Sequence, residues 1–280
     1  FKKTYSSIVI RNSSFKKMSL YSELFYSTEI NELFSDWNTI AQMLRFEAAL
    51  AEAQAANGII SASSAEIIAD CCRANLIDID KLKTEIKLGG NAAIPLVKQL
   101  TRIVKNNNVE ASKYVHLGAT SQDVVDTATV LQIQTYVDWL EGKLSVLTQL
   151  LVKITQKHRT TLMIGRTLLQ QARPITFGLK TAGWLEGIER SQQRIQESKK
   201  RILVLQLVGA VGSGNASISK EVNQNVADLL GLRSASSWQT QRDTIAEWAS
   251  VLGILTGSLG KIAKDISLLM QTEVGEVFEG

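Results

Sequence analysis

Apolar residues recur at helical spacing along most of the chain, and no strand-like alternation of apolar and polar residues persists anywhere. Two stretches, residues 123–158 and 245–269, carry the pattern most clearly, because their apolar positions alternate at intervals of three and four. The first stripe consists of Ile133, Val137, Leu140, Leu144, Leu147, Leu151 and Ile154, and the second of Ile245, Trp248, Leu252, Leu255, Leu259, Ile262, Ile266 and Leu269. Such heptad spacing predicts long helices that bury one stripe against neighbouring helices.

A third long helix is expected between these two, beginning at Pro174 and running to about Leu207. The chain has only two prolines, and this scarcity permits long helices because an internal proline costs about 3 kcal/mol. Each long helix would measure roughly 40–50 Å at about 1.5 Å per residue. Three such rods bury their stripes only against each other or against helices of other subunits.

Capping and stop signals predict four shorter helices ahead of the rods. They cover residues 39–57, 61–75, 78–88 and a stretch with Pro95 in its first turn that runs to about residue 105. Ser35 or Asp36 would cap the first, and Gly58 would end it. The expected fold class is therefore all-α. The chain is expected to comprise a non-native or disordered tail (1–17), a small N-terminal helical domain (18–122) and part of a long-helix bundle domain (123–280).

The positive charge of the chain is concentrated in the tail. The net charge is +4, but residues 1–17 carry five cations and no acid, so the rest of the chain has one net negative charge. That near-neutral body argues against a nucleic-acid partner. We interpret the tail as non-native or upstream sequence with Met18 as the natural start, a transit-like segment being the alternative. No apolar run approaches the roughly 18 residues that a membrane helix needs.

Cysteine and histidine are too sparse for a disulfide framework or a metal site. Cys71 and Cys72 are adjacent, and neighbouring helical side chains point apart, which disfavours a bridge between them. A chain without disulfides suits a reducing cytoplasm. His116 and His158 lie far apart, and no Cys/His spacing recurs. A phosphate-binding glycine pattern is also missing, so the sequence predicts neither a metal nor a cofactor.

Three polar segments at the predicted ends of the rods carry the candidate chemistry. The first, residues 116–123, has Gly118 for a tight turn and then Thr120 and Ser121 at the start of a long helix. Helix starts hold unpaired N–H donors and a partial positive charge, which favours an anion site. The alternative is an ordinary helix cap supplied by Ser121.

The second and third segments add arginine and glutamine. Residues 165–178 contain Arg166 and Gln171, and residues 238–243 contain Gln239 and Arg242. Arginine grips carboxylates with a bidentate fork, and glutamine offers adaptable donors. The alternative for the second segment is a solvated connecting loop. The alternative for the third is a surface ion pair of Arg242 with Asp243. If the rods are antiparallel, the three segments can meet and form a site that binds a carboxylate. Such a site needs neither a metal nor a nucleotide.

These segments resemble shared regions of the fumarase/aspartase superfamily. Residues 116–127 (HLGATSQDVVDT) look like its first region, and residues 165–178 (GRTLLQQARPITFG) look like its second. In the second region, Leu168 stands where adenylosuccinate lyases and fumarases usually have a histidine. Residues 89–100, 238–243 and 257–279 most resemble the bacterial 3-carboxy-cis,cis-muconate cycloisomerases within that superfamily.

The resemblance implies a cytoplasmic homotetramer whose active sites are each assembled from three subunits. Members use no cofactor and catalyse anti addition or elimination beside a carboxylate of a small polycarboxylate substrate. The substrate-binding positions that it implies are Asn91, Thr120, Ser121, Arg166, Gln171, Gln239 and Arg242, with Arg166 the weakest of them. The general-base serine belongs to a third signature that is expected beyond Gly280, together with the C-terminal domain. The chain alone is therefore expected to be inactive.

Three functions remain open on the sequence. The first is lactonisation of 3-carboxy-cis,cis-muconate in protocatechuate degradation. The second is an adenylosuccinate lyase or another lyase of the superfamily. The third is a non-catalytic helical oligomeric scaffold, although a scaffold has no need of polar segments at the ends of its helices. Leu168 favours the first function over the second, because leucine cannot protonate a leaving amine.

Overall fold

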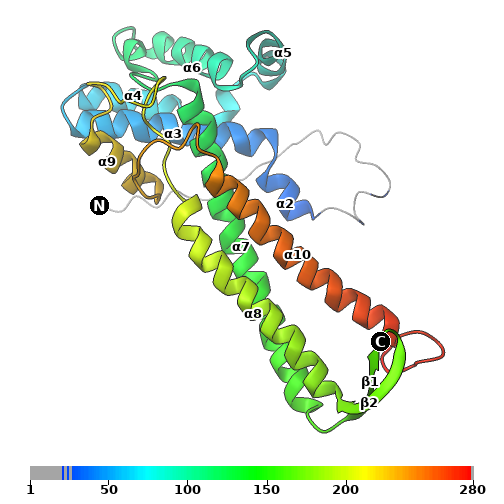
Figure 1. Cartoon of the computed structure of the whole chain (residues 1–280). Coiled ribbons are helices and arrows are strands. Elements are labelled where there is room, and N and C mark those ends of the chain that lie inside the picture. The colour runs from blue at the N-terminus through cyan, green and yellow to red at the C-terminus, as the bar shows by residue number, and fades with distance from the viewer. Residues whose placement is uncertain (1–20, 22–23, 25–26, 279–280) are drawn as a thin grey trace.

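Three long helices form a rod that extends from a cluster of shorter helices (Figure 1). They are α7 (Ser121–Lys157), α8 (Phe177–Ile202) and α10 (Asp243–Leu269). The computed structural model describes Tyr21, Leu24 and residues 27–278. The fold class predicted from the sequence is confirmed, since helices dominate these residues. The tail expected at residues 1–17 lies outside the described residues, and the domain boundary at residue 122 stays a prediction.

The shorter helices gather at one end of the rod (Figure 1). They are α2 (Thr28–Leu33), α3 (Asp36–Ala56), α4 (Ala62–Cys71), α5 (Ile79–Gly89), α6 (Ala93–Asn107) and α9 (Lys220–Leu230), with single 3-10 turns at Ala74–Leu76 and Ala111–Tyr114. The predicted end signals are used: the Ser35 hydroxyl accepts from the Asn38 N–H at 3.2 Å and caps α3. Gly58 follows α3 at a φ of 70°, a conformation that costs glycine little. The helix predicted over residues 61–75 ends earlier, at Cys71.

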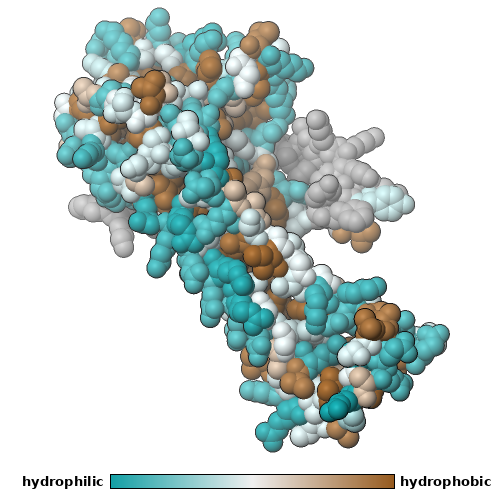
Figure 2. Space-filling model, in the orientation of Figure 1, coloured by the Kyte–Doolittle hydropathy of each residue, from teal (hydrophilic) through white to brown (hydrophobic). Residues whose placement is uncertain are grey.

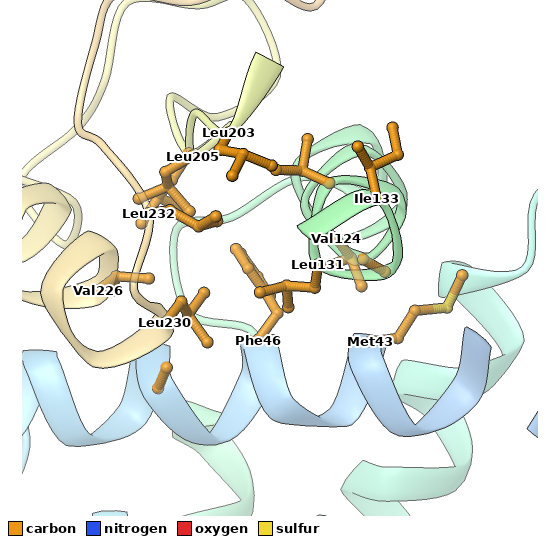
Figure 3. Packing of buried hydrophobic residues seen from close by; sticks show 14 of the residues in the cluster. Met43, Phe46, Val124, Leu131, Ile133, Leu203, Leu205, Val226, Leu230 and Leu232 are labelled. Carbon is orange, nitrogen blue, oxygen red and sulfur yellow. The ribbon is translucent and has the colours of Figure 1, made fainter. Parts of the chain in front are cut away.

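The principal core lies where α3, α7 and α9 meet the extended segment that follows α8. Figure 3 shows Phe46 of α3, Leu131 of α7, Val226 of α9 and Leu205 of that segment turned toward one another. Phe46 and Val226 are completely buried. This packing joins helices that are distant in the sequence, and it fixes the start of α7 against the segments on either side of α9.

The apolar stripe of α7 is buried over most of its length, as its heptad spacing predicted. Its buried members are Ile133, Val137, Leu140, Leu144 and Leu151. The stripe of α10 is only partly covered, because Leu259 and Ile266 stay 37% and 39% exposed. Figure 2 shows apolar residues breaking the hydrophilic surface of the rod. None of the helices within the described residues is long and apolar enough to cross a membrane.

A small hairpin joins α7 to α8, and the sequence analysis did not predict it. Strands β1 (Leu162–Thr167) and β2 (Gln170–Thr176) pair antiparallel, with an irregularity between Ile164 and Arg166. The prediction that Pro174 begins the third long helix is wrong, because Pro174 lies in β2 and α8 begins at Phe177. A proline is tolerated in a two-stranded ribbon, where a missing N–H need not break a ladder.

The hairpin turns through two leucines in the left-handed region. Leu168 and Leu169 have φ values of 50° and 66°, and both side chains are exposed. Asparagine and glycine are the residues that such a two-residue turn favours. Each left-handed leucine costs about 1–2 kcal/mol.

Replacing this pair by asparagine and glycine is therefore expected to stabilise the protein. The double variant Leu168→Asn, Leu169→Gly should raise the free energy of unfolding by about 1–2 kcal/mol, measured from the urea midpoint. The single variant Leu162→Asn is the control, since Leu162 is also exposed but lies outside the turn. A double variant less stable than the parent protein would contradict this account of the turn.

Candidate functional site

The start of α7 is built by Thr120, Ser121 and Asp123. Thr120 is the cap residue, in a capping box with Asp123, and Ser121 is the first residue of the helix. The start of α7 therefore has an ordinary cap, as the alternative proposed, but Thr120 and not Ser121 supplies it. The Asp123 carboxylate accepts a hydrogen bond from the Thr120 N–H at 3.0 Å. Gly118 precedes this turn at a φ of 79°, as the tight turn expected there requires. The hydroxyls of Thr120 and Ser121 thus stand at the positive end of a helix of 37 residues.

Asp123 also holds a second segment against the start of α7. Its fully buried carboxylate accepts from the backbone N–H groups of Val208 and Gly209, at 3.2 and 3.0 Å, and from the Gln206 side-chain amide at 3.2 Å. A buried carboxylate requires such donors, since desolvation of its charge is otherwise costly. This role of Asp123 was not predicted from the sequence, because its partners lie more than 80 residues away.

A glycine-rich loop, residues 209–217, closes over the turn at Gly118. Gly209, Gly212 and Gly214 all have positive φ values. The Asn215 amide donates to the Gly118 carbonyl at 2.8 Å, and a Cβ on Gly118 would lie 2.7 Å from the Asn215 Oδ1. This loop was not predicted from the sequence, although its three glycines in six residues are a local signal for one.

Arg242, the strongest arginine candidate, lies beside the start of α7 but is not free. Its guanidinium grips Asp126 through both terminal nitrogens, at 2.8 and 2.9 Å. Gln122 donates to the same carboxylate at 2.8 Å, and the guanidinium stacks over Trp238 at 5.2 Å from the ring centre. Arg242 therefore does not form the alternative surface pair with Asp243. It pairs instead with Asp126 of α7, whose side chain is only 8% exposed.

Gln239 is brought to the same place by its neighbour Trp238. The Trp238 N–H donates to the Gln206 side chain at 3.0 Å, and its indole N–H donates to the Leu205 carbonyl at 3.3 Å. A Cβ on Gly212 would lie 3.7 Å from the Gln239 Nε2, so Gln239 borders the glycine-rich loop. Three segments far apart in sequence, 118–126, 205–217 and 238–242, thus meet at one end of the rod.

The buried Glu47 pairs with the half-buried His116, two residues before Gly118, and this pair was not identified from the sequence. The His116 Nδ1 is 2.7 Å from the Glu47 carboxylate of α3. Burial alone would lower the pKa of His116, but the hydrogen bond and charge of Glu47, with the charge of Asp123, outweigh it and raise that pKa. From the same helix, the Gln54 amide donates to the carbonyls of Leu117 and Ser217, at 2.8 and 2.9 Å.

The other three predicted site residues lie apart from this place. Arg166 in β1 makes a bidentate pair with Glu276, at 2.8 and 3.2 Å. Gln171 is exposed in β2 opposite Arg166, at the far end of the rod (Figure 1). The side chain of Asn91 accepts from the N–H of Ala93, the first residue of α6, at 2.7 Å. The folded chain therefore brings together four of the seven candidates: Thr120, Ser121, Gln239 and Arg242.

The assembled end of the rod presents hydroxyls, amides and an arginine around a helix start. These groups are suited to binding a small organic anion. No group of three or more potential metal-ligating side chains occurs among the residues that the structure describes. The fold and site thus define a class of long-helix proteins with a polar, anion-suited site at one end of the bundle.

The chain belongs to the Lyase family, whose pattern it matches over residues 24–280. It is 46% identical to the 3-carboxy-cis,cis-muconate cycloisomerase of Acinetobacter baylyi over 93% of the chain and 59% of that relative. It is 35% identical to the adenylosuccinate lyase of Methanocaldococcus jannaschii over 90% of the chain and 54% of that relative.

A solved structure agrees with these sequence matches. The crystal structure of the 3-carboxy-cis,cis-muconate lactonizing enzyme from Pseudomonas putida superposes with a TM-score of 0.90 at 46% identity, covering 93% of this chain and 60% of that one. The resemblance found in the sequence is thereby confirmed. The chain spans about three fifths of the length of these cycloisomerase relatives.

Proposed function

We propose that the chain forms the first part of a 3-carboxy-cis,cis-muconate cycloisomerase. The observation that carries the proposal is the agreement of two likenesses, in sequence and in structure, with proteins of that activity over 93% of the chain. The substrate is a polycarboxylate, and Thr120, Ser121, Gln239 and Arg242 supply groups that bind carboxylates. The enzyme would act without a cofactor in the cytoplasm, and its general base would come from outside these 280 residues.

In the proposed reaction, one carboxylate of the substrate adds to the substrate's own double bond and closes a lactone. The nucleophile is already ionised and needs no base to activate it. Binding both ends of the substrate supplies proximity, which is worth about 7–11 kcal/mol in favourable cases. The remaining tasks are to stabilise the enediolate and to deliver one proton to carbon. Donors at a helix start and cationic side chains perform the first of these. The serine expected outside these 280 residues would perform the second: it delivers the proton in the lactonising direction and is the general base in the reverse direction.

Leu168 supports this reaction over elimination of an amine. A leaving amine must be protonated, and leucine cannot donate a proton. Gln171 lies in the same hairpin and can donate hydrogen bonds but does not titrate near neutral pH. Leu168 is also 95% exposed in the isolated subunit, so this position contributes to a site only where another subunit covers it.

The proposal is tested by assaying the full-length protein with 3-carboxy-cis,cis-muconate, following loss of the diene absorbance, and in parallel with adenylosuccinate. Turnover of the muconate alone supports the proposal. Turnover of adenylosuccinate alone would replace it with the lyase function. Activity on neither substrate, with a folded protein, would favour the scaffold function.

We further propose a homotetramer in which three subunits build each site. The motivating observation is that β1 and β2, which carry Arg166 and Gln171, lie at the opposite end of the rod from the start of α7 (Figure 1). Exposed apolar residues along the rod also require cover. They include Val146, Leu150 and Ile154 on α7, and Ile254, Leu259 and Ile266 on α10.

The full-length protein is therefore expected to sediment as a tetramer. The double variant Ile254→Lys, Leu259→Lys should shift it toward smaller species, because each lysine buries a charge in a subunit contact. The control is Leu88→Lys, since Leu88 is 89% exposed on α5, away from the rod. A stable, well-folded monomer of the parent protein would contradict the bundle assembly.

A further inference from the structure

A buried glutamate that pairs with a half-buried histidine beside Gly118 has no role in the proposed reaction. Glu47 lies in the middle of α3 with a relative exposure of 1%. One of its oxygens meets His116 at 2.7 Å, whereas Oε2 is buried with no hydrogen-bond partner among the described residues. A buried carboxylate with a single partner depends strongly on the charge of that partner, because its own desolvation is costly.

His116 opens the segment that ends at the anion site. Its backbone has a φ of 60°, unfavourable for a residue with a side chain, and its side chain is 18% exposed. Gly118 and Thr120 follow within four residues. Asp123 links the two places, since its charge contributes to the raised pKa of His116 and its carboxylate accepts from the Thr120 N–H.

The groups around His116 leave Glu47 as its principal counter-charge. Asp123 contributes from α7, and its carboxylate is already satisfied by four donors. The neighbouring thiol of Cys72, at the end of α4, is uncharged, because burial and the charge of Glu47 raise its pKa well above the usual value. Deprotonation of His116 therefore leaves the negative charge of Glu47 uncompensated behind a site that binds anions.

We propose that Glu47 is a positioning residue for the carboxylate site: it holds His116 as an imidazolium at the base of the segment leading to Thr120. This inference rests on the proposed polycarboxylate substrate. The ion pair keeps the surroundings of the site free of net negative charge and clamps the segment to α3. Gln54 clamps the same segment with a neutral side chain. Affinity for a polycarboxylate is then coupled to protonation of His116, and it falls as pH rises through the pKa of that histidine.

The first measurement is the titration of His116 itself, followed by NMR on histidine-labelled full-length protein. In the parent protein, His116 should titrate above the ordinary value of about 6.5. In Glu47→Gln, which keeps the shape and removes the charge, its pKa should fall by about one unit or more. Glu52→Gln, five residues further along α3, is the matched control and should leave it unchanged. An equal pKa of His116 in the parent and in Glu47→Gln would overturn the proposal.

The second measurement is the affinity for tricarballylate, an unreactive tricarboxylate, by calorimetry between about pH 6 and about pH 9. In the parent protein, Kd should rise about tenfold across the titration of His116. The double variant Glu47→Gln, His116→Gln replaces the ion pair with a neutral pair of similar size, and it protects the test against misfolding of a single variant. Its Kd should not change across this range. The same pH dependence in both proteins would overturn the coupling.

These outcomes are separable from the proposed reaction, because neither measurement needs turnover. Failure to convert 3-carboxy-cis,cis-muconate, with the pH-coupled binding of tricarballylate intact, would reject the reaction and leave the role of Glu47 standing. Full conversion of the muconate by a protein in which Glu47→Gln changes neither the His116 titration nor the pH dependence of Kd would reject only the role of Glu47.

Discussion

Replacing Arg242 by alanine is expected to lower kcat/KM of the full-length protein by about 30- to 1000-fold, which corresponds to about 2–4 kcal/mol. Arg242 is the cation beside the start of α7, and its fork holds Asp126 at 2.8 and 2.9 Å. Its removal takes away a group for a substrate carboxylate. It also leaves Asp126, only 8% exposed, without its partner. Steady-state kinetics with the muconate substrate measures the effect.

Two further variants distinguish the two roles of Arg242, which are binding the substrate carboxylate and pairing with Asp126. Asp126→Asn keeps the shape of the carboxylate while removing the charge that Arg242 satisfies, so it should impair kcat/KM less than Arg242→Ala. Arg201→Ala breaks a more exposed arginine pair, with Glu247, and should change kcat/KM little. If Arg242→Ala lowers the stability but leaves kcat/KM unchanged, Arg242 has no part in the site.

Replacing Asp123 by alanine is expected to reduce the free energy of unfolding by about 3–5 kcal/mol. The carboxylate is fully buried and accepts four hydrogen bonds. Three of the donors are backbone N–H groups, and that of Gly209 would stay buried without an acceptor in the variant. The glycine-rich loop would also lose its attachment to α7, so activity should fall together with stability.

Urea denaturation at fixed protein concentration measures this effect, since assembly makes the stability depend on concentration. Asp138→Ala on the same helix is the control, because Asp138 is 68% exposed and pairs with Lys199 only at 3.5 Å. That variant should lose less than about 1 kcal/mol. Equal losses in the two variants would show that Asp123 does not hold the loop.

The helices were predictable from the sequence because their signals are local. A heptad stripe, a capping serine at Ser35 and a stop glycine at Gly58 each act within a few residues. The hairpin was not predictable in the same way. None of its strand residues is buried, so the strands need no alternation of apolar and polar residues. Its turn uses Leu168 and Leu169 in place of the residues that mark such turns.

The candidate site was predicted as a set of residue types but not as a set of partners. Thr120, Ser121, Gln239 and Arg242 could be selected because polar residues at helix starts have a local chemical meaning. The pairing of Arg242 with Asp126 spans 116 residues, and that of His116 with Glu47 spans 69. No local pattern encodes such distances, so these partners emerged only from the packing of α3, α7 and α10.

The base of the hairpin has a consequence for how this part of the chain can vary. The N–H groups of Phe177 and Gly178 donate to the carbonyls of Thr161 and His158, both at 2.9 Å. A Cβ on Gly178 would lie 2.6 Å from the Arg159 Cα, so α7 and α8 are locked together below the hairpin. The hairpin, residues 162–176, therefore begins and ends at a junction where the positions of α7 and α8 are already fixed. They can be exchanged for a hairpin of another length or sequence while the two helices keep their register, which makes this segment a natural place to graft a new specificity.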